Sequence, residues 1–187
     1  MKKYFIFASV TAAIIVMSAV VMSCGGDSGT ATKGASQTAG SPVLPVAENP
    51  IKNNSTTPGL VIASARAEDN FDPETRKDIP DSLQIELKNS SAQTMNNLEI
   101  FSRMTDSSTG ASEGYYQKLD GLNLSPGETK TIFFDNKTTP GHYPENKYSL
   151  YRTSKSEVAF SIVLSAPGFK PATGETKKAP GTGEQQD

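Results

Sequence analysis

The chain has 187 residues, of which 35% are hydrophobic and 20% charged, and its formal net charge is −2 at pH 7. A mildly acidic chain with mixed charges is poorly suited to a polyanion, so we expect no nucleic-acid partner. Cys24 is the only cysteine, which excludes an intrachain disulfide. Stability must therefore come from an apolar core.

The first 24 residues have the three parts of a secretory signal. A basic start is followed by an apolar run over residues 4–22, and the small Ser23 precedes Cys24. This arrangement resembles the lipobox of bacterial lipoproteins, in which the cysteine is acylated and becomes the new N-terminus. The resemblance implies a signal peptide over residues 1–23 and a lipid anchor on Cys24. Two alternatives stay open: an ordinary secretory signal cleaved elsewhere, and an uncleaved membrane anchor.

The residue that follows Cys24 bears on localisation. In the lipoprotein family an aspartate at this position retains some members in the inner membrane, and this chain has Gly25 instead. The resemblance therefore implies outer-membrane rather than inner-membrane placement, with the protein facing the periplasm or the cell surface. The membrane, reached through the lipid on Cys24, is the first expected partner.

Two segments have the composition of disordered chain. Residues 24–58 are rich in Gly, Ser, Thr, Ala, Pro and Asn without an aromatic residue, which predicts a flexible linker behind the acylated N-terminus. Within it, the apolar patch at residues 43–46 either docks locally or stays extended because of Pro45. Residues 171–187 predict a disordered tail. These boundaries leave residues 59–170 for one folded domain.

Inside that domain the hydrophobic period is two. Leu83, Ile85 and Leu87 alternate with polar residues, as in a half-buried strand. Turn dipeptides such as Pro126-Gly127 separate comparable runs. The pattern predicts strands that begin at residue 60 and cover 83–87, 98–104, 115–119, 129–134 and 158–164, with a short piece at 148–152. Short strands without long helices predict an all-β protein, a single antiparallel β-sandwich, with a mixed barrel as the alternative.

Two segments carry a second resemblance. Residues 85–92 (IELKNSSA) and 122–129 (LNLSPGET) resemble bacterial immunoglobulin-like (Ig-like) adhesion or accessory domains, in which an Asn-Ser turn ends one strand and a Pro-Gly-Glu-Thr segment leads into a later one. The resemblance implies an Ig-like sandwich. That scaffold hosts many functions, so it implies no particular one.

One segment matches a hydrolase sequence motif but lacks the secondary structure that the motif needs. Gly110 to Gly114 fits G-x-S-x-G around Ser112, and His142 lies downstream in the order of α/β-hydrolases. That motif needs a strand before the serine and a helix after it, whereas polar residues precede this one and a predicted strand follows. A polar loop explains the segment, so a small hydrolase using Ser112 and His142 is only a remote alternative.

Metal and cofactor sites are not indicated. His142 is the only histidine, and its segment, residues 140–144, reads as an exposed turn in which the histidine is a polar filler. The acidic residues 68–74 offer oxygen ligands for calcium but lack the spacing of an EF-hand, which favours a solvated loop. We expect no metal and no cofactor.

The aromatic residues suggest a binding face. The tyrosines that follow the signal segment all fall within residues 115–151, and neighbours on a strand point to opposite sides, so one of Tyr115 and Tyr116 would be exposed. Together with Tyr143 or Tyr151, it would form a face for a partner or a sugar ring. The layout predicts a non-enzymatic binding or accessory module that contacts an envelope protein or polysaccharide. A carbohydrate-binding module that uses the tyrosine face is the alternative.

Overall fold

The computed structural model describes residues 43–68, 71–72, 77–78 and 82–181. The predicted signal peptide, Cys24 and residues 25–42 lie outside this part of the chain, as does most of the acidic segment 68–74. Within the described ranges no helix is long and apolar enough to cross a membrane. The elements in chain order are β1 (Leu60–Ala67), β2 (Phe71–Asp72), β3 (Lys77–Asp78), β4 (Leu83–Asn89), β5 (Glu99–Asp106), β6 (Ser112–Lys118), β7 (Thr129–Phe134), β8 (His142–Tyr143), α1 (Leu150–Thr153), β9 (Val158–Ser165) and β10 (Ala172–Lys178).

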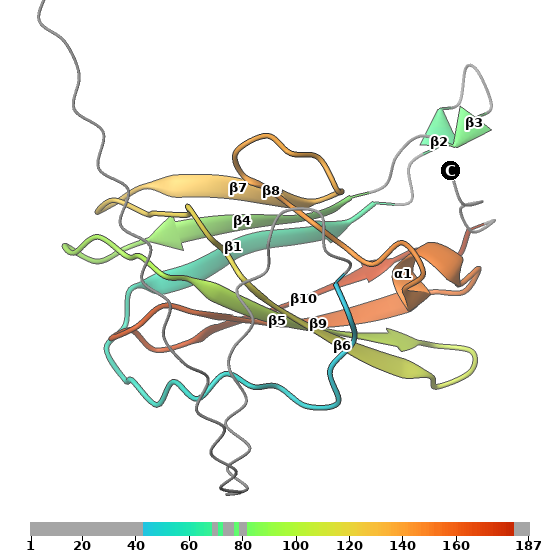
Figure 1. Cartoon of the computed structure of the whole chain (residues 1–187), viewed down its shortest axis with the longest axis horizontal. Helices are drawn as coiled ribbons and strands as arrows, with labels where there is room; N and C mark the ends of the chain where they lie inside the picture. The colour runs from blue at the N-terminus through green and yellow to red at the C-terminus, as the bar shows by residue number, and fades with distance from the viewer. Residues whose placement is uncertain (1–42, 69–70, 73–76, 79–81, 182–187) are drawn as a thin grey trace, which may run out of the picture. The chain divides into compact units, whose positions relative to one another are not determined.

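The strands form a β-sandwich of two four-stranded sheets, as the sequence predicted, and Figure 1 shows the two layers. One sheet has the order β1-β4-β7-β8 and the other β10-β9-β5-β6, while β2 and β3 pair separately. All pairs are antiparallel except β7 with β8. In the lettering of immunoglobulin domains, β1, β4 and β7 occupy the places of A, B and E. The other sheet, read from β10, follows G, F, C and C′.

The core lies between the sheets and follows from the alternation of side chains. Leu83, Ile85 and Leu87 of β4 face inward and are buried, while the residues between them are not. Val158, Phe160, Ile162 and Leu164 of β9 face them from the other sheet and are also buried. Because each strand turns one row of side chains inward and the other toward solvent, the two sheets pack face to face over a single apolar layer.

The two sheets come together along one side and stay open along the other. On the closed side, Gly174 of β10 faces Ile62 of β1, and a methyl group added to Gly174 would lie only 3.0 Å from the Ile62 side chain. On the open side, β6 and the β7–β8 pair are the edge strands. Loops cross this opening, and they form the candidate site described below.

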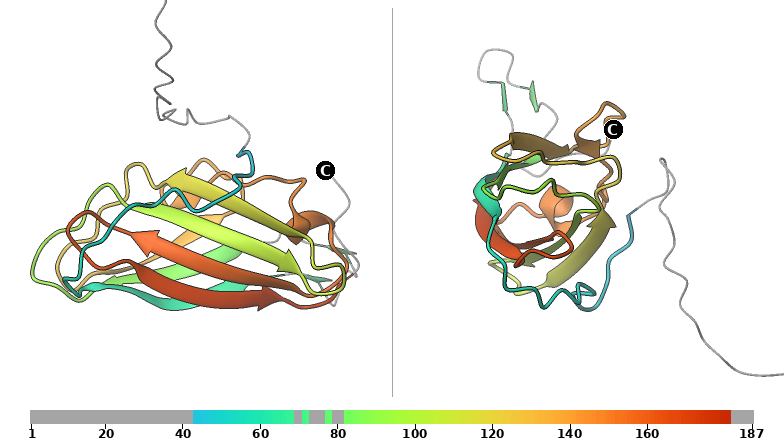
Figure 2. Two further views of the ribbon diagram at one scale, coloured as in Figure 1. Left: turned by 90° about the horizontal axis from the view of Figure 1, so that it is seen from below. Right: turned by 90° about the vertical axis from the view of Figure 1, so that its left-hand side faces the viewer.

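The predicted flexible linker is wrong over its described part. Residues 43–58, here called the N-terminal strap, run along the outside of the sheet that contains β5 and β9 (Figures 1 and 2). Val43 is fully buried, and the Val46 N–H donates to the Gly114 carbonyl at 2.7 Å. The Asn53 amide bonds to three acceptors near the end of β9: the Ser165 hydroxyl and the Ala166 and Phe169 carbonyls. Composition concealed these contacts, because they depend on single residues.

The predicted disordered tail is wrong in the same way. Residues 172–178 form β10, which pairs with β9 along its whole length. The strand ends at Lys178, whose side chain is almost fully buried and whose ammonium donates to the carbonyls of Tyr151 and Ser154. The folded domain therefore extends beyond residues 59–170 at both ends. The short piece predicted at 148–152 contains the helix α1 instead of a strand.

Candidate functional site

The tyrosine face predicted from the sequence is not present. Tyr115, Tyr143 and Tyr151 are 5%, 8% and 0% exposed. Tyr151 packs edge-on against Phe160, with ring centroids 5.4 Å apart, and its hydroxyl donates to a backbone carbonyl. These three tyrosines belong to the core, where burial removes the apolar surface of their rings from water. This removes the geometry on which a carbohydrate site at these four residues depended.

Tyr116 is the only member of the predicted face that points outward. Its hydroxyl donates to the Glu99 carboxylate at 2.8 Å, on the outer side of the sheet. Burial raises the pKa of the Tyr116 phenol to about 12, and the hydrogen bond to Glu99 and its charge act in the same direction. A single tied tyrosine does not make an aromatic platform.

Ser112 and His142 are not assembled as a nucleophile and its base. Ser112 lies on β6, and its hydroxyl donates to the Met104 carbonyl at 3.0 Å. His142 begins β8 in the other sheet, where its Nδ1 contacts the Asp135 carboxylate. The strand around Ser112 also lacks the strand-to-helix turn that the hydrolase motif requires.

A cleft opens between the sheets beside β7, and we call it the edge cleft. Its volume is about 610 Å³. Three short segments surround it: the turn after β6, the exposed edge of β7, and the loop that leads into β8. The lining residues are Asp120, Gly121, Leu122, Lys130, Thr131, Ile132, Thr138, Thr139, Pro140, Gly141, His142 and Tyr143.

Some backbone groups of β7 face this cleft without a partner strand among the described residues. Antiparallel pairs alternate between hydrogen-bonded and non-hydrogen-bonded residues. The Asn89 N–H donates to the Glu128 carbonyl, and the Phe133 N–H donates to the Gly141 carbonyl of the β8 side. The residues that face away from β4 are therefore Thr129, Thr131 and Phe133. Because β8 pairs only with Phe133 and Phe134, no strand in the described part of the chain pairs with the outward N–H and C=O of Thr129 and Thr131.

His142 closes one end of the cleft and is not the exposed filler expected from the sequence. Its Nδ1 lies 2.8 Å from Asp135 Oδ1, and its ring stacks on Phe133 with centroids 4.8 Å apart. Lys137 reaches the other Asp135 oxygen at 3.0 Å. Burial raises the pKa of Asp135, but the hydrogen bonds from His142 and Lys137 outweigh it and hold the pKa below its ordinary value. This cluster fixes the loop that forms the cleft wall.

The remaining charges of the cleft are unevenly neutralised. The Lys130 ammonium donates to the Asn123 carbonyl at 2.7 Å and pairs with Glu128 at 3.1 Å. Within the described residues, Asp120 has no hydrogen bond or ion pair from its side chain. Burial raises the pKa of the Tyr143 phenol to about 12, and the negative charge of Asp120 adds to the rise. The cleft thus has one unpaired carboxylate at its rim.

The cleft's chemistry is that of a binding site built from backbone groups, hydroxyls and one acid. Within the described residues no group of three side chains could hold a metal ion. The sequence drew attention to His142 only as a remote hydrolase residue, a metal ligand or an exposed filler, and not as part of a binding cleft with Asp120 and Asp135. The free edge of β7 was missed, and no sequence signal marks it, because it depends on how short β8 is.

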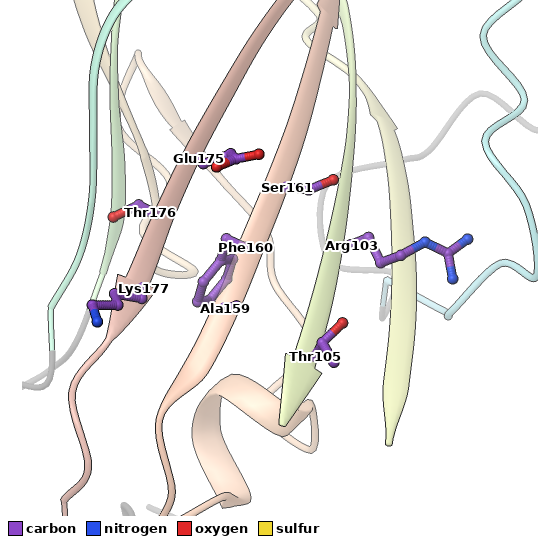
Figure 3. A pocket seen from close by; sticks show the side chains of 8 residues that line it. All are labelled: Arg103, Thr105, Ala159, Phe160, Ser161, Glu175, Thr176 and Lys177. Carbon is purple, nitrogen blue, oxygen red and sulfur yellow. The ribbon is translucent and has the colours of Figure 1, made fainter. Parts of the chain in front are cut away.

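A second hollow, of about 430 Å³, lies on the outer face of the other sheet, where Arg103, Thr105 and Ser161 project to one side while Phe160 points into the core (Figure 3). Its cations already have partners. Arg103 donates to the Ala47 carbonyl of the N-terminal strap, and Lys177 pairs with Glu157 at 2.8 Å. The edge cleft is the better candidate because the backbone groups of β7 that face it have no partner strand among the described residues.

Comparison with known proteins gives no family. No family model and no curated protein match this chain. Among solved structures, a β-glucosidase involved in saponin metabolism from intestinal bacteria is 19% identical with a TM-score of 0.31, over 65% of this chain and 16% of the glucosidase. Spo0M, a sporulation control protein from Bacillus subtilis, is 11% identical with a TM-score of 0.29, over 74% of this chain and 48% of Spo0M. The chain thus spans less than half the length of either protein, and likenesses this weak do not assign a function.

Proposed function

We propose that this chain is a lipid-anchored protein of the cell envelope whose β-sandwich is a non-enzymatic binding module, with the edge cleft as its ligand site. The observation that carries the proposal is a cleft of about 610 Å³ beside a strand edge whose backbone groups have no partner strand among the described residues. Concave sites with a few convergent polar groups are the usual places where proteins bind ligands.

The sequence supports the location. The lipobox-like start, with Cys24 after an apolar run, favours acylation and export, and Gly25 favours the outer membrane over the inner one. A tether of this kind holds the sandwich at high local concentration near envelope polymers and proteins. Stable anchoring needs more than one acyl chain, which the lipoprotein pathway supplies on this cysteine.

The anchor is tested by mass spectrometry of the full chain expressed in bacteria, compared with Cys24→Ala. We expect the wild-type N-terminus to begin at Cys24 with bound acyl chains, and the variant to retain its signal segment and incorporate no labelled palmitate. An unacylated wild-type N-terminus refutes the anchor.

The binding site is tested with the detergent-extracted full chain and three kinds of immobilised probe: purified peptidoglycan, a panel of envelope polysaccharides, and displayed random peptides. Thr139→Trp places a large ring in the edge cleft, whereas Thr173→Trp makes the same change at an exposed position of β10. We expect the first variant to weaken binding about tenfold or more and the second to bind as wild type does, since tenfold corresponds to about 1.4 kcal/mol. Equal binding by both variants, or no retention on any probe, refutes the edge cleft as the site.

A further inference from the structure

We infer that the edge cleft receives an extended polypeptide segment of another protein, which adds as a strand to the free edge of β7 and places a lysine or arginine beside Asp120. The inference rests on the proposed function and names the ligand class of that site. Strand addition to an exposed sheet edge is a common mode of peptide recognition, in which backbone hydrogen bonds supply the affinity.

The register of β7 defines what a guest strand meets. Glu128, Lys130, Ile132 and Phe134 bond toward β4, so Thr129 and Thr131 direct their backbone N–H and C=O groups into the cleft. The position of Gly141 agrees with this direction, because a methyl group added there would lie 3.7 Å from the Thr131 carbonyl oxygen.

The length of the guest segment follows from where β8 begins. β8 pairs with Phe133 and Phe134, and the Phe133 N–H donates to the carbonyl of Gly141, which lies opposite Ile132, so a guest strand has the edge of residues 129–131 available. At about 3.3 Å per residue, three residues span roughly 10 Å. A guest would place alternate side chains toward the cleft wall, where Leu122 and Pro140 are apolar, and would end against the loop held by His142.

Two of the other sheet edges are already blocked. On β6, Val46 of the N-terminal strap pairs with Gly114, and no larger residue fits there because a Cβ would lie 2.8 Å from the Val46 carbonyl oxygen. On β1, the register shifts between Ile62 and Ser64, which interrupts the row of backbone groups. The β6 edge is thus covered by the N-terminal strap and the β1 edge is interrupted by a bulge, whereas the β7 edge faces a cleft.

Charge selects the side chain of the guest. Lys130 is paired with Glu128, and Lys137 and His142 are paired with Asp135, whereas Asp120 has no partner within the described residues. An incoming cation would gain a carboxylate without displacing another. A polysaccharide would meet the threonine hydroxyls, but its own hydroxyls do not repeat the alternating N–H and C=O groups that β7 presents.

The test uses a displayed library of random heptapeptides, selected on the detergent-extracted full chain, with the enriched peptide then synthesised. Thr131→Pro removes the N–H that faces the cleft and leaves the bonds to β4 intact, whereas Thr131→Val keeps the N–H and removes only the hydroxyl. We expect the proline variant to lose tenfold or more in affinity and the valine variant at most about threefold, since each tenfold is about 1.4 kcal/mol. Asp120→Asn should weaken a basic peptide about threefold to tenfold and leave its uncharged analogue unaffected.

A second measurement does not depend on the proline variant folding. On the wild-type chain, N-methylation of alternate peptide residues should abolish binding in one phase of the alternation and spare it in the other. Equal loss in both phases, or unchanged affinity of a folded Thr131→Pro variant, overturns strand addition. If a polysaccharide is retained, Thr139→Trp releases it and no peptide is enriched, strand addition is overturned while the proposed function stands.

Discussion

Replacing Lys178 by methionine tests the unexpected end of the fold. The Lys178 ammonium donates to the Tyr151 carbonyl at 2.8 Å and to the Ser154 carbonyl at 2.7 Å, and it lies 5.9 Å from the centre of the Tyr151 ring. These acceptors belong to the last turn of α1 and its C-terminal cap. Lys178 thus joins the end of β10 to the helix that lies at one end of the sandwich.

The expected loss of stability follows from these contacts. Hydrogen bonds to a charged group contribute about 1.5–3 kcal/mol each, so removing both costs roughly 3–6 kcal/mol. Methionine keeps most of the apolar stem, and the variant no longer has to dehydrate an ammonium ion, which returns part of that cost. We expect Lys178→Met to lower the free energy of unfolding by about 2–4 kcal/mol, or the melting temperature by roughly 5–15 °C.

The neighbouring residue supplies the control. Lys177 is exposed and its ammonium pairs with Glu157 at the surface, so Lys177→Met should change stability by about 0.5 kcal/mol or less. Urea unfolding of the wild type and both variants measures the difference. Equal, small effects of the two substitutions would refute the burial of Lys178 and restore a disordered C-terminal segment.

Three further predictions concern the strap, an acidic turn and the cleft. Gly114→Ala places a methyl group 2.8 Å from the Val46 carbonyl oxygen, so it should destabilise the fold by about 1–3 kcal/mol. It should also speed hydrogen exchange at the Val46 N–H. Unchanged exchange would contradict the position of the N-terminal strap. The Asp106 carboxylate accepts hydrogen bonds from Ser154, which has the largest effect, and from Ser108 and Thr109 of its own turn. These bonds hold the pKa of Asp106 well below the ordinary value of 3.8. The stability that the Asp106 carboxylate contributes is therefore complete above pH 3.8 and is lost as the pH falls below it. We expect the urea midpoints at about pH 3 and pH 6 to differ less in Asp106→Asn than in the wild type. An equal difference in both proteins would refute this role of Asp106. Asp120→Asn should lower the pKa of Tyr143 from about 12 without reaching its ordinary value of 10.0, since burial remains, and ultraviolet absorbance titration that finds no change contradicts their proximity.

Part of the fold was predictable because it rests on local repetition. The alternation at Leu83, Ile85 and Leu87 identified β4, and similar runs identified β5, β7 and β9. Turn residues between them predicted antiparallel pairs. Each of these signals lies within about eight residues of the chain, so a single sequence contains them in full.

The segments that sequence reasoning missed lack such repetition. β10 has the sequence ATGETKK, with a single apolar residue, and its place depends on pairing with β9 and on Gly174 making room for Ile62. The N-terminal strap is anchored by separate contacts of Val43, Val46 and Asn53. Average composition does not reveal such residues, because each one stabilises the fold through its own specific contacts.

The sequence by itself determined the class of fold and the lipobox-like start, since both follow from short patterns of apolar, small and basic residues. Tertiary structure alone decided which side chains are available. It buried Tyr115, Tyr143 and Tyr151 in the core and joined His142 to Asp135. Among the described strands it also left Thr129 and Thr131 without a neighbour on their outer edge. The physical reason is that an exposed edge or a buried ring depends on what packs beside it, and those neighbours are distant in the chain.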